Sequence, residues 1–252
     1  MDTRTAFASD YDGTLRVGLG PLSYRRGDLA AISAYQEVGG LFGLCTGRAM
    51  VAIRDTIPDS LHLDFCITLS GAQVYDGERG LIENHGLSHE IAGRICEACR
   101  PSARRVMFST DEAYYGFGAI PLIMRSLIRS VRSAEEVPCD IHGISMGFRS
   151  PDAASRAVTM INERFADVAA AFQNRESVDV VPLGCSKGTG LACVRDRFGV
   201  GTTAGIGDSF NDVPLLDEAD VAYTFKRSPE DVRSHADVLV GTVAEAIADF
   251  SR

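Results

Sequence analysis

Short apolar runs alternate with helical patterns at both ends of this 252-residue chain, and this alternation constrains the fold more than any other feature. Near the N-terminus the pattern predicts strands at 5–9, 41–45 and 65–69, with a helix at 27–38 between the first two and a short helix after Gly47. Near the C-terminus it predicts helices at 187–198, 211–216 and 243–250 and strands at 203–206, 221–223 and 238–240. Strands separated by helices are typical of a parallel sheet, so we expect an α/β fold.

The middle of the chain has a different pattern. It predicts two helices, at 120–131 and 153–165, among short strands at 105–109, 145–148, 168–172 and 177–181. This indicates an α+β insertion of roughly 100 residues within the α/β core. We therefore expect residues 1–80 and 182–252 to form a Rossmann-like core, and residues 81–181 to form the insertion.

Composition narrows the possible partners and compartment. The formal net charge of −9 disfavours binding to nucleic acid through overall electrostatic attraction. No apolar run reaches the roughly 20 residues of a membrane span, and residues 1–10 lack the apolar stretch of a secretory signal. Seven cysteines, an odd number, fit reduced thiols better than a disulfide framework. We expect a cytoplasmic protein without a nucleic-acid or membrane partner; the oligomeric state is left open.

The segment Asp10-Tyr11-Asp12-Gly13-Thr14 directly follows the first predicted strand. Residues two apart on an extended segment point the same way, so Asp10 and Asp12 are expected to lie together at the strand's carboxyl end. Two carboxylates that close favour an intervening cation or proton. They could act as a metal-assisted nucleophile and an acid/base, or merely as solvated carboxylates of an Asp-Gly turn.

Two further segments carry groups suited to an anion. Thr46, Gly47 and Arg48 follow the second strand, where Thr46 can cap the next helix and Arg48 would fall in its first turn. Lys187 opens another helix after Ser186, a predicted N-cap. Each residue could hold a phosphate; the alternatives, favoured when each segment is taken alone, are a simple cap and solvated cations.

The last segment, Gly207-Asp208-Ser209-Phe210-Asn211-Asp212, follows the strand at 203–206. Hard oxygen ligands of this kind suit magnesium, and a capping cluster is the alternative. In a parallel sheet all these segments would share one edge. Paired carboxylates, a hard cation and groups that clamp an anion are the parts that phosphoryl transfer requires.

The four motifs DYDGT, TGR, SKG and GDSFND, in this order, resemble those of the haloacid dehalogenase superfamily, in particular its Cof-like small-molecule phosphatases. The resemblance covers the whole chain, because that family inserts an α/β cap between the second and third motifs. The segment Leu69-Ser70-Gly71-Ala72 is similar to a family segment that usually reads Asn-Gly-Ala. Here Ser70 replaces the Asn, which leaves open whether this position contacts the substrate.

The resemblance implies a magnesium-dependent phosphatase acting on a small phosphate ester, with sugar phosphates favoured. It implies that Asp10 is the nucleophile and that Asp12 is the acid/base. Thr46, Gly47, Lys187 and Asn211 would bind phosphate, and Arg48 would point to the phosphate or only pack the helix start. Magnesium would be held by Asp10, Asp208 and the main-chain carbonyl of Asp12, with support from Asp212.

Three alternatives stay open: a phosphosugar mutase, a sucrose- or trehalose-phosphate type of phosphatase, and a non-catalytic sensor of phosphorylated metabolites. The insertion is expected to choose the substrate. Its basic cluster, Arg100, Arg104 and Arg105, could meet an anionic substrate or form a solvated face. The nearby aromatic side chains of residues 114, 115 and 117 could stack on a sugar ring or pack in the core.

Overall fold

The structure, a computed structural model, describes residues 4–18, 23–122 and 125–252, and it contains two sheets. The strands of the first sheet are β1 (Thr5–Ser9), β2 (Leu41–Cys45), β3 (Phe65–Thr68), β4 (Gln73–Asp76), β5 (Leu81–Asn84), β12 (Thr202–Gly207), β13 (Val221–Phe225) and β14 (Val238–Val240). Those of the second are β6 (Arg105–Ser109), β7 (Tyr114–Gly118), β8 (Ile128–Ser130), β9 (Gly143–Gly147), β10 (Ala169–Asn174) and β11 (Ser177–Pro182).

The helices connect these strands. They are α1 (Arg26–Glu37), α2 (Met50–Ile53), α3 (His89–Cys99), α4 (Pro151–Arg164), α5 (Lys187–Phe198), α6 (Val213–Glu218), α7 (Glu230–Arg233) and α8 (Val243–Phe250), with 3-10 turns η1 (Leu69–Gly71), η3 (Ala134–Glu136) and η4 (Phe210–Asp212). Among the described residues no helix combines the length and the apolar character that a membrane crossing demands.

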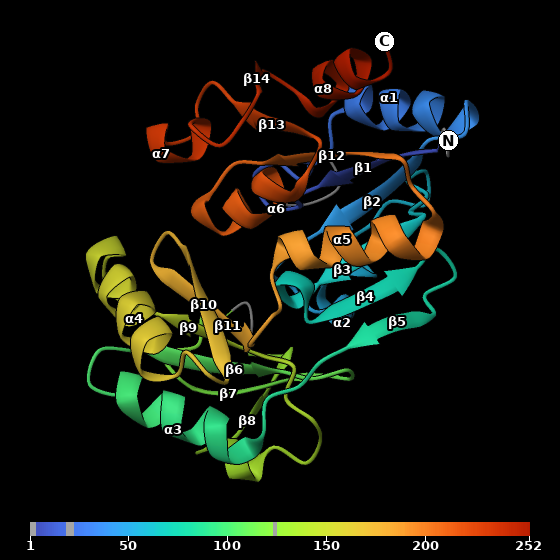
Figure 1. The fold of residues 1–252 in the computed structure, drawn as a ribbon. Helices are drawn as coiled ribbons and strands as arrows, with labels where there is room; N and C mark the ends of the chain where they lie inside the picture. Colours follow the sequence, from blue (N-terminus) through green and yellow to red (C-terminus); the bar gives the residue numbers. More distant parts are fainter. Residues whose placement is uncertain (1–3, 19–22, 123–124) are drawn as a thin grey trace.

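The first sheet has the strand order β14-β13-β12-β1-β2-β3-β4-β5, with β1 to β3 and β12 to β14 parallel and β4 and β5 antiparallel. Helices α1 and α8 cover one face around Phe7 and Phe42, while α5 and α6 cover the other around Phe65 and Ile67 (Figure 1). Both faces of the central strands are therefore buried, which explains their nearly continuous apolar runs. We call this sheet and its helices the core.

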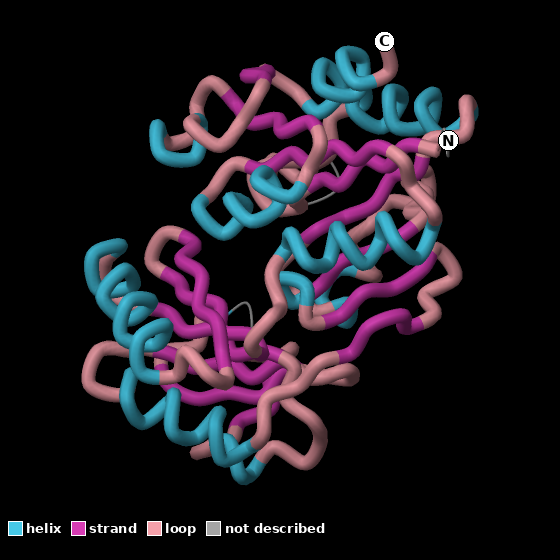
Figure 2. The backbone as a smooth tube through the Cα atoms, viewed as in Figure 1, coloured by secondary structure: helices cyan, strands magenta, loops and turns pink. Residues whose placement is uncertain are grey.

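The second sheet has the order β10-β11-β9-β6-β7-β8 and is antiparallel except between β7 and β8. Helices α3 and α4 pack on one of its faces, burying residues such as Val106, Ile144 and Val178 (Figure 2). We call this sheet with its two helices the cap. The α/β fold with a parallel core sheet and an inserted α+β unit, as expected from the sequence, is confirmed.

Two local expectations differ from the structure. Strand β5 pairs with β4 and completes the core sheet, although residues 81–84 fall within the segment expected to be insertion. The predicted helix over 120–131 is wrong at its C-terminal end, because residues 128–130 form strand β8 beside β7. Residues 123 and 124 of that segment lie outside the described residues. The apolar residues of this segment do not form one buried helical face, because Ile128 and Val131 are buried but Leu127 is 65% exposed.

Candidate active site

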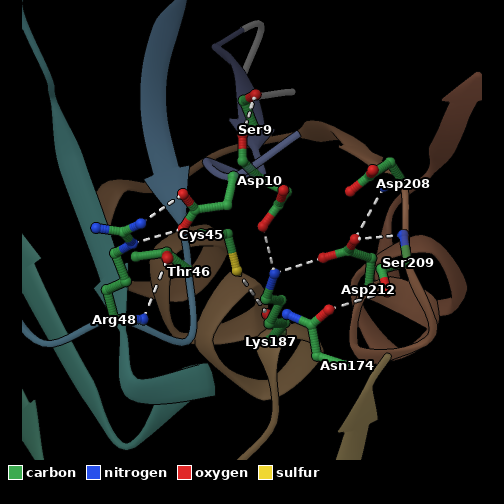
Figure 3. Close-up of polar contacts among 11 residues, drawn as sticks. Ser9, Asp10, Cys45, Thr46, Arg48, Asn174, Lys187, Asp208, Ser209 and Asp212 are labelled. Carbon is green, nitrogen blue, oxygen red and sulfur yellow. Dashed lines mark hydrogen bonds and ion pairs between the residues drawn. The ribbon is translucent and has the colours of Figure 1, made fainter. Parts of the chain in front are cut away.

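Three neighbouring parallel strands bring the predicted motifs to one edge of the core sheet. Strand β1 lies between β2 and β12, and Asp10, Thr46 and Asp208 follow directly after these strands. Lys187 is the first residue of α5, whose N-cap Ser186 accepts a hydrogen bond from Thr189 in a capping box. The expected gathering of these side chains is therefore present in the structure (Figure 3).

Lys187 is the buried cation of the site. Its side chain is fully buried, and its Nζ donates to Asp10 Oδ1 at 2.7 Å and to Asp212 Oδ1. Burial is the largest single effect and lowers the pKa of Lys187, but the two carboxylates act in the other direction, and the net result is a pKa well above the ordinary value. A solvated surface lysine, one of the two alternatives from the sequence, is thereby excluded.

Three carboxylates surround this lysine. Oxygen atoms of Asp10, Asp208 and Asp212 all lie within 4.8 Å of one another. Burial, with the neighbouring Asp212 carboxylate as the second cause, raises the pKa of Asp10 to about 8, although Lys187 opposes the shift. Burial and Asp212 raise the pKa of Asp208 as well. One ammonium does not balance three clustered carboxylates, and hard oxygen donors at this spacing fit a divalent cation such as Mg²⁺.

The loop after β1 approaches this cluster closely. Gly13 has a φ of +89°, and a Cβ on it would lie 2.6 Å from Asp208 Oδ2. Any other residue at position 13 would collide with the carboxylate in a backbone conformation that favours glycine. The glycine of the first motif thus allows the β1 loop and the Asp208 loop to lie against each other.

Asp12 is not among the carboxylates of the acidic cluster, although it follows Asp10 by two residues. The chain turns after Tyr11, whose carbonyl accepts from Arg16 N at 2.8 Å. Instead, Arg48 Nε and Nη2 donate to the two oxygens of Asp12 at 2.6 and 2.7 Å (Figure 3). Both side chains are partly exposed, so this pair can open without leaving a buried charge.

The second motif is a loop and not a helix start. Helix α2 begins at Met50 with Ala49 as its N-cap, so Arg48 precedes the helix and the expected cap by Thr46 is absent. Thr46 is buried, and its Oγ1 accepts from the backbone N of Arg48 at 3.1 Å. This hydrogen bond closes a short turn and fixes the position of the Thr46 hydroxyl directly after β2.

The fourth motif combines the two interpretations that the sequence left open. Asp212 Oδ2 accepts from the backbone N of Asp208 and of Ser209, both at 2.9 Å, while its other oxygen binds Lys187. It therefore organises the loop as a cap and also contributes charge to the site. Asn211, expected to bind phosphate, is buried beside it in η4.

Three cap residues reach the core, of which sequence reasoning singled out Tyr114 for stacking or core packing but missed Asn174 and Asp179. Tyr114 Oη accepts from Ala49 N at 2.9 Å, and Asn174 Oδ1 accepts from Ser209 Oγ at 3.4 Å. Asp179 lies against Gly47, because a Cβ on that glycine would be 2.8 Å from Asp179 Oδ2. The strict alternation Ser-Val-Asp-Val over 177–180 was an available signal, since it puts Asp179 on the face opposite the buried valines.

The solved structures that resemble this chain share its whole fold. A HAD subclass IIB sugar phosphatase is 19% identical and covers 98% of this chain and 99% of its own length, with a TM-score of 0.80. A Streptococcus mutans protein, SMU.1108c, is 18% identical with 98% coverage of both chains and a TM-score of 0.84. A phosphatase from Bacteroides thetaiotaomicron is 20% identical over 99% of this chain and 96% of its own, with a TM-score of 0.81.

Sequence comparisons agree with this likeness. An HMP-PP phosphatase of Citrobacter koseri is 24% identical over 219 residues, which are 83% of this chain and 79% of that protein. The family profile of the haloacid dehalogenase-like hydrolases matches residues 7–250, from the first core strand to the last helix. The resemblance carried by the four motifs is thus confirmed, and the chain belongs to the haloacid dehalogenase-like hydrolases.

Proposed function

We propose that this protein is a magnesium-dependent phosphatase that hydrolyses small phosphate esters through an aspartyl-phosphate on Asp10. The observation that carries the proposal is the position of the Asp10 carboxylate. It lies at the carboxyl edge of the sheet, 2.7 Å from Lys187 Nζ and inside a cluster of acidic oxygens. A structural ion pair has no need of three clustered carboxylates near one ammonium, whereas a nucleophile for phosphoryl transfer is activated by such surroundings.

In the first half-reaction a carboxylate oxygen of Asp10 attacks phosphorus, and the bond from phosphorus to the leaving oxygen breaks. Asp12 gives its proton to that oxygen, so the product leaves as an alcohol. In the second half-reaction Asp12 takes a proton from water as the water oxygen attacks phosphorus. Inorganic phosphate is released and the Asp10 carboxylate is restored.

The other residues of the site hold the transferring group. Lys187 neutralises charge on a phosphoryl oxygen, and the Thr46 hydroxyl and Gly47 backbone can donate to the others. Mg²⁺ would be held by Asp10, Asp208 and the main-chain carbonyl of Asp12, and it would supply charge neutralisation for the phosphoryl oxygens. Asp212 supports this site through the Asp208 and Ser209 amides.

The hydrogen bonds from Arg48 to Asp12 affect when Asp12 can act as an acid. A bidentate guanidinium favours the ionised form of the acid, which suits the second half-reaction but opposes the first. A phosphate ester entering beside Thr46 competes for Arg48 and can free Asp12 to take up a proton. Arg48 would therefore contact the Asp12 carboxylate in the free enzyme and the phosphate in the complex.

The test is a phosphate-release assay with p-nitrophenyl phosphate and a panel of phosphorylated metabolites, with and without Mg²⁺. We expect Mg²⁺-dependent turnover that Asp10→Asn reduces by several powers of ten while the Tm and the circular dichroism spectrum stay native. Beryllium fluoride should label Asp10 in the wild type. Near wild-type turnover by Asp10→Asn, or an adduct on another carboxylate, would refute the assignment.

The leaving group is proposed to be a sugar or another small polar metabolite. A neighbour of this fold is named a sugar phosphatase and a relative is named an HMP-PP phosphatase, so the leaving groups in the family differ widely. The same panel separates the alternatives. A requirement for a bisphosphate activator would identify a phosphosugar mutase, and tight binding without turnover would identify a sensor.

A further inference from the structure

An arginine that belongs to none of the four motifs reaches the loop that carries Asp12. Arg227 follows strand β13, and β12 lies between β13 and β1 in the core sheet (Figure 1). Its Nη2 donates to the main-chain carbonyl of Gly13 at 2.6 Å. The first motif is therefore held by a side chain that lies far along the chain and on the other side of the fourth motif.

Stacking holds the Arg227 side chain in position. Its Cζ lies 3.8 Å from the centroid of the Phe225 ring, which is fully buried. A planar guanidinium that is already stacked loses little side-chain freedom when it donates a hydrogen bond. Ser228 N donates to Phe225 O at 3.0 Å and closes the turn around Arg227. The side chain is anchored but exposed, so its truncation leaves the buried core unchanged.

The turn after β13 contacts both loops of the candidate metal site. Thr224 Oγ1 donates at 2.7 Å to the carbonyl of Gly207, the residue directly before Asp208. Arg227 donates to the carbonyl of Gly13 in the other loop. The two loops also lie against each other, because a Cβ on Gly13 would be 2.6 Å from Asp208 Oδ2. One turn outside the motifs thus links the first motif to the fourth.

Gly13 is a position where the loop needs such an anchor. Its left-handed conformation and its approach to Asp208 require glycine, but glycine restricts the backbone least. On one side, Gly13 N donates to Arg16 O at 2.9 Å and fixes the peptide that contains the Asp12 carbonyl. In a trans peptide that carbonyl points opposite to the Gly13 N–H. On the other side, the Gly13 carbonyl accepts from Arg227, so the two hydrogen bonds together fix the orientation of the Asp12 carbonyl.

The charge of Arg227 acts against a cation at this site. Burial and Asp212 raise the pKa of Asp208, whereas Arg175 and Arg227 oppose that shift, so Arg227 is near enough to affect the Asp208 carboxylate. A guanidinium that acted through charge alone would repel a divalent cation held by Asp208. A guanidinium that acts through the Gly13 carbonyl would favour binding of the same cation. Because the two effects have opposite signs, one measurement separates them.

We propose that Arg227 is a positioning residue of the magnesium site. Through the Gly13 carbonyl it holds the loop of the first motif in the conformation in which the Asp12 carbonyl can serve as a ligand beside Asp208. This inference rests on the proposed phosphatase function and deepens it, because it assigns part of the affinity for Mg²⁺ to a residue outside the four motifs.

The test measures binding of Mg²⁺ to the protein without substrate. Mg²⁺ is titrated into the wild type, Arg227→Met and Arg227→Lys, and the dissociation constant is taken from the dependence of the Tm on the Mg²⁺ concentration. Arg197→Met is the matched control, because Arg197 is an exposed arginine in the last turn of α5, at the opposite end of that helix from Lys187. On the same proteins, hydrolysis of p-nitrophenyl phosphate gives the half-saturating Mg²⁺ concentration and the KM at saturating Mg²⁺.

We expect Arg227→Met to bind Mg²⁺ roughly 5- to 20-fold more weakly than the wild type, the effect of losing one hydrogen bond from a charged donor. Arg227→Lys keeps the charge and one donor on a shorter stem, so its affinity should lie between those of the wild type and Arg227→Met. The half-saturating Mg²⁺ concentration should rise in the same order. Arg197→Met should bind Mg²⁺ as the wild type does.

Any other order of the three affinities overturns the assignment. If Arg227→Met binds Mg²⁺ as tightly as the wild type or more tightly, the guanidinium acts through its charge or not at all. A raised KM with unchanged Mg²⁺ affinity would make Arg227 a substrate contact and would equally overturn the positioning role. In both cases the wild type still hydrolyses p-nitrophenyl phosphate with Mg²⁺, so the proposed function stands. If the wild type neither binds nor requires Mg²⁺, the proposed function fails and the inference falls with it.

Discussion

Replacing Lys187 by Met should destabilise the protein more than any other single substitution at the site. The change removes an ammonium whose side chain is fully buried between Asp10 and Asp212 and keeps a chain of similar shape. Breaking a buried pair by removing one partner typically costs about 3–5 kcal/mol, because the remaining charge is left uncompensated. For a chain of this size each kcal/mol lowers the Tm by roughly 2–4 °C, so we expect a fall of about 6–20 °C.

The chain offers a matched control, because its only other lysine, Lys226, is exposed. Lys226→Met should change the Tm little. Thermal unfolding should be followed by differential scanning calorimetry with and without saturating Mg²⁺. A divalent cation replaces the lost charge, so Mg²⁺ should raise the Tm of Lys187→Met by more than that of the wild type. This gain reports on the metal site independently of activity.

The pH dependence gives a second check. The pKa of Lys187 is raised in the folded state, so its contribution to stability is present at neutral pH and is lost only above its ordinary value near 10.5. In the variant, the clustered carboxylates have pKa values above those of the unfolded chain, and their ionisation costs stability as the pH rises. The Tm deficit should therefore shrink from pH 7 toward pH 4. A deficit below about 1 kcal/mol at neutral pH would refute the charge argument.

Three further outcomes follow from the site. Asp12→Asn should slow hydrolysis of alkyl phosphates by roughly 10²–10⁴-fold and that of p-nitrophenyl phosphate much less, because a good leaving group needs no acid; equal losses would remove Asp12 from the acid role. Asp208→Ala should raise the Mg²⁺ concentration for half-maximal activity, and an unchanged titration would leave Asp208 as a loop residue only. Asp179→Asn should stabilise the protein by about 1–2 kcal/mol at pH 7, because ionising a carboxyl whose pKa is raised to about 6 costs folding free energy. The partial exposure of the side chain keeps this cost smaller than full burial would make it. In urea unfolding, that gain should shrink as the pH falls from about 6 to 3.8 and vanish well below pH 3.8, where Asp179 is protonated in both states.

The core could be predicted from sequence because its signals are local. Strand β2, helix α5, strand β14 and helix α8 have the predicted bounds, since each apolar run ends at a glycine, a cap or a polar motif. The gathering of Asp10, Thr46 and Asp208 followed from a general property of parallel sheets. Neither inference needed a long-range contact to be known in advance.

One segment of the cap was harder to predict, because its apolar spacing suits both a helix and a strand. Residues 120–131 show apolar spacing that also suits a helix, but residues 128–130 pair with β7 and form an edge strand. The Asp12–Arg48 pair was missed for a similar reason. Its geometry depends on a turn at Tyr11, which the alternation of Asp10 and Asp12 does not reveal.

The position of β12 between β1 and β13 has a consequence for biosynthesis. Strand β1 ends at residue 9, and its partner β12 begins only at residue 202. At roughly 5–20 residues per second, a ribosome takes about 10–40 s to make the intervening chain. During that interval the first core strands carry an open apolar edge, while the cap, whose strands pair only among themselves, can already fold. Until β12 is made, that open edge is a template for pairing with another chain.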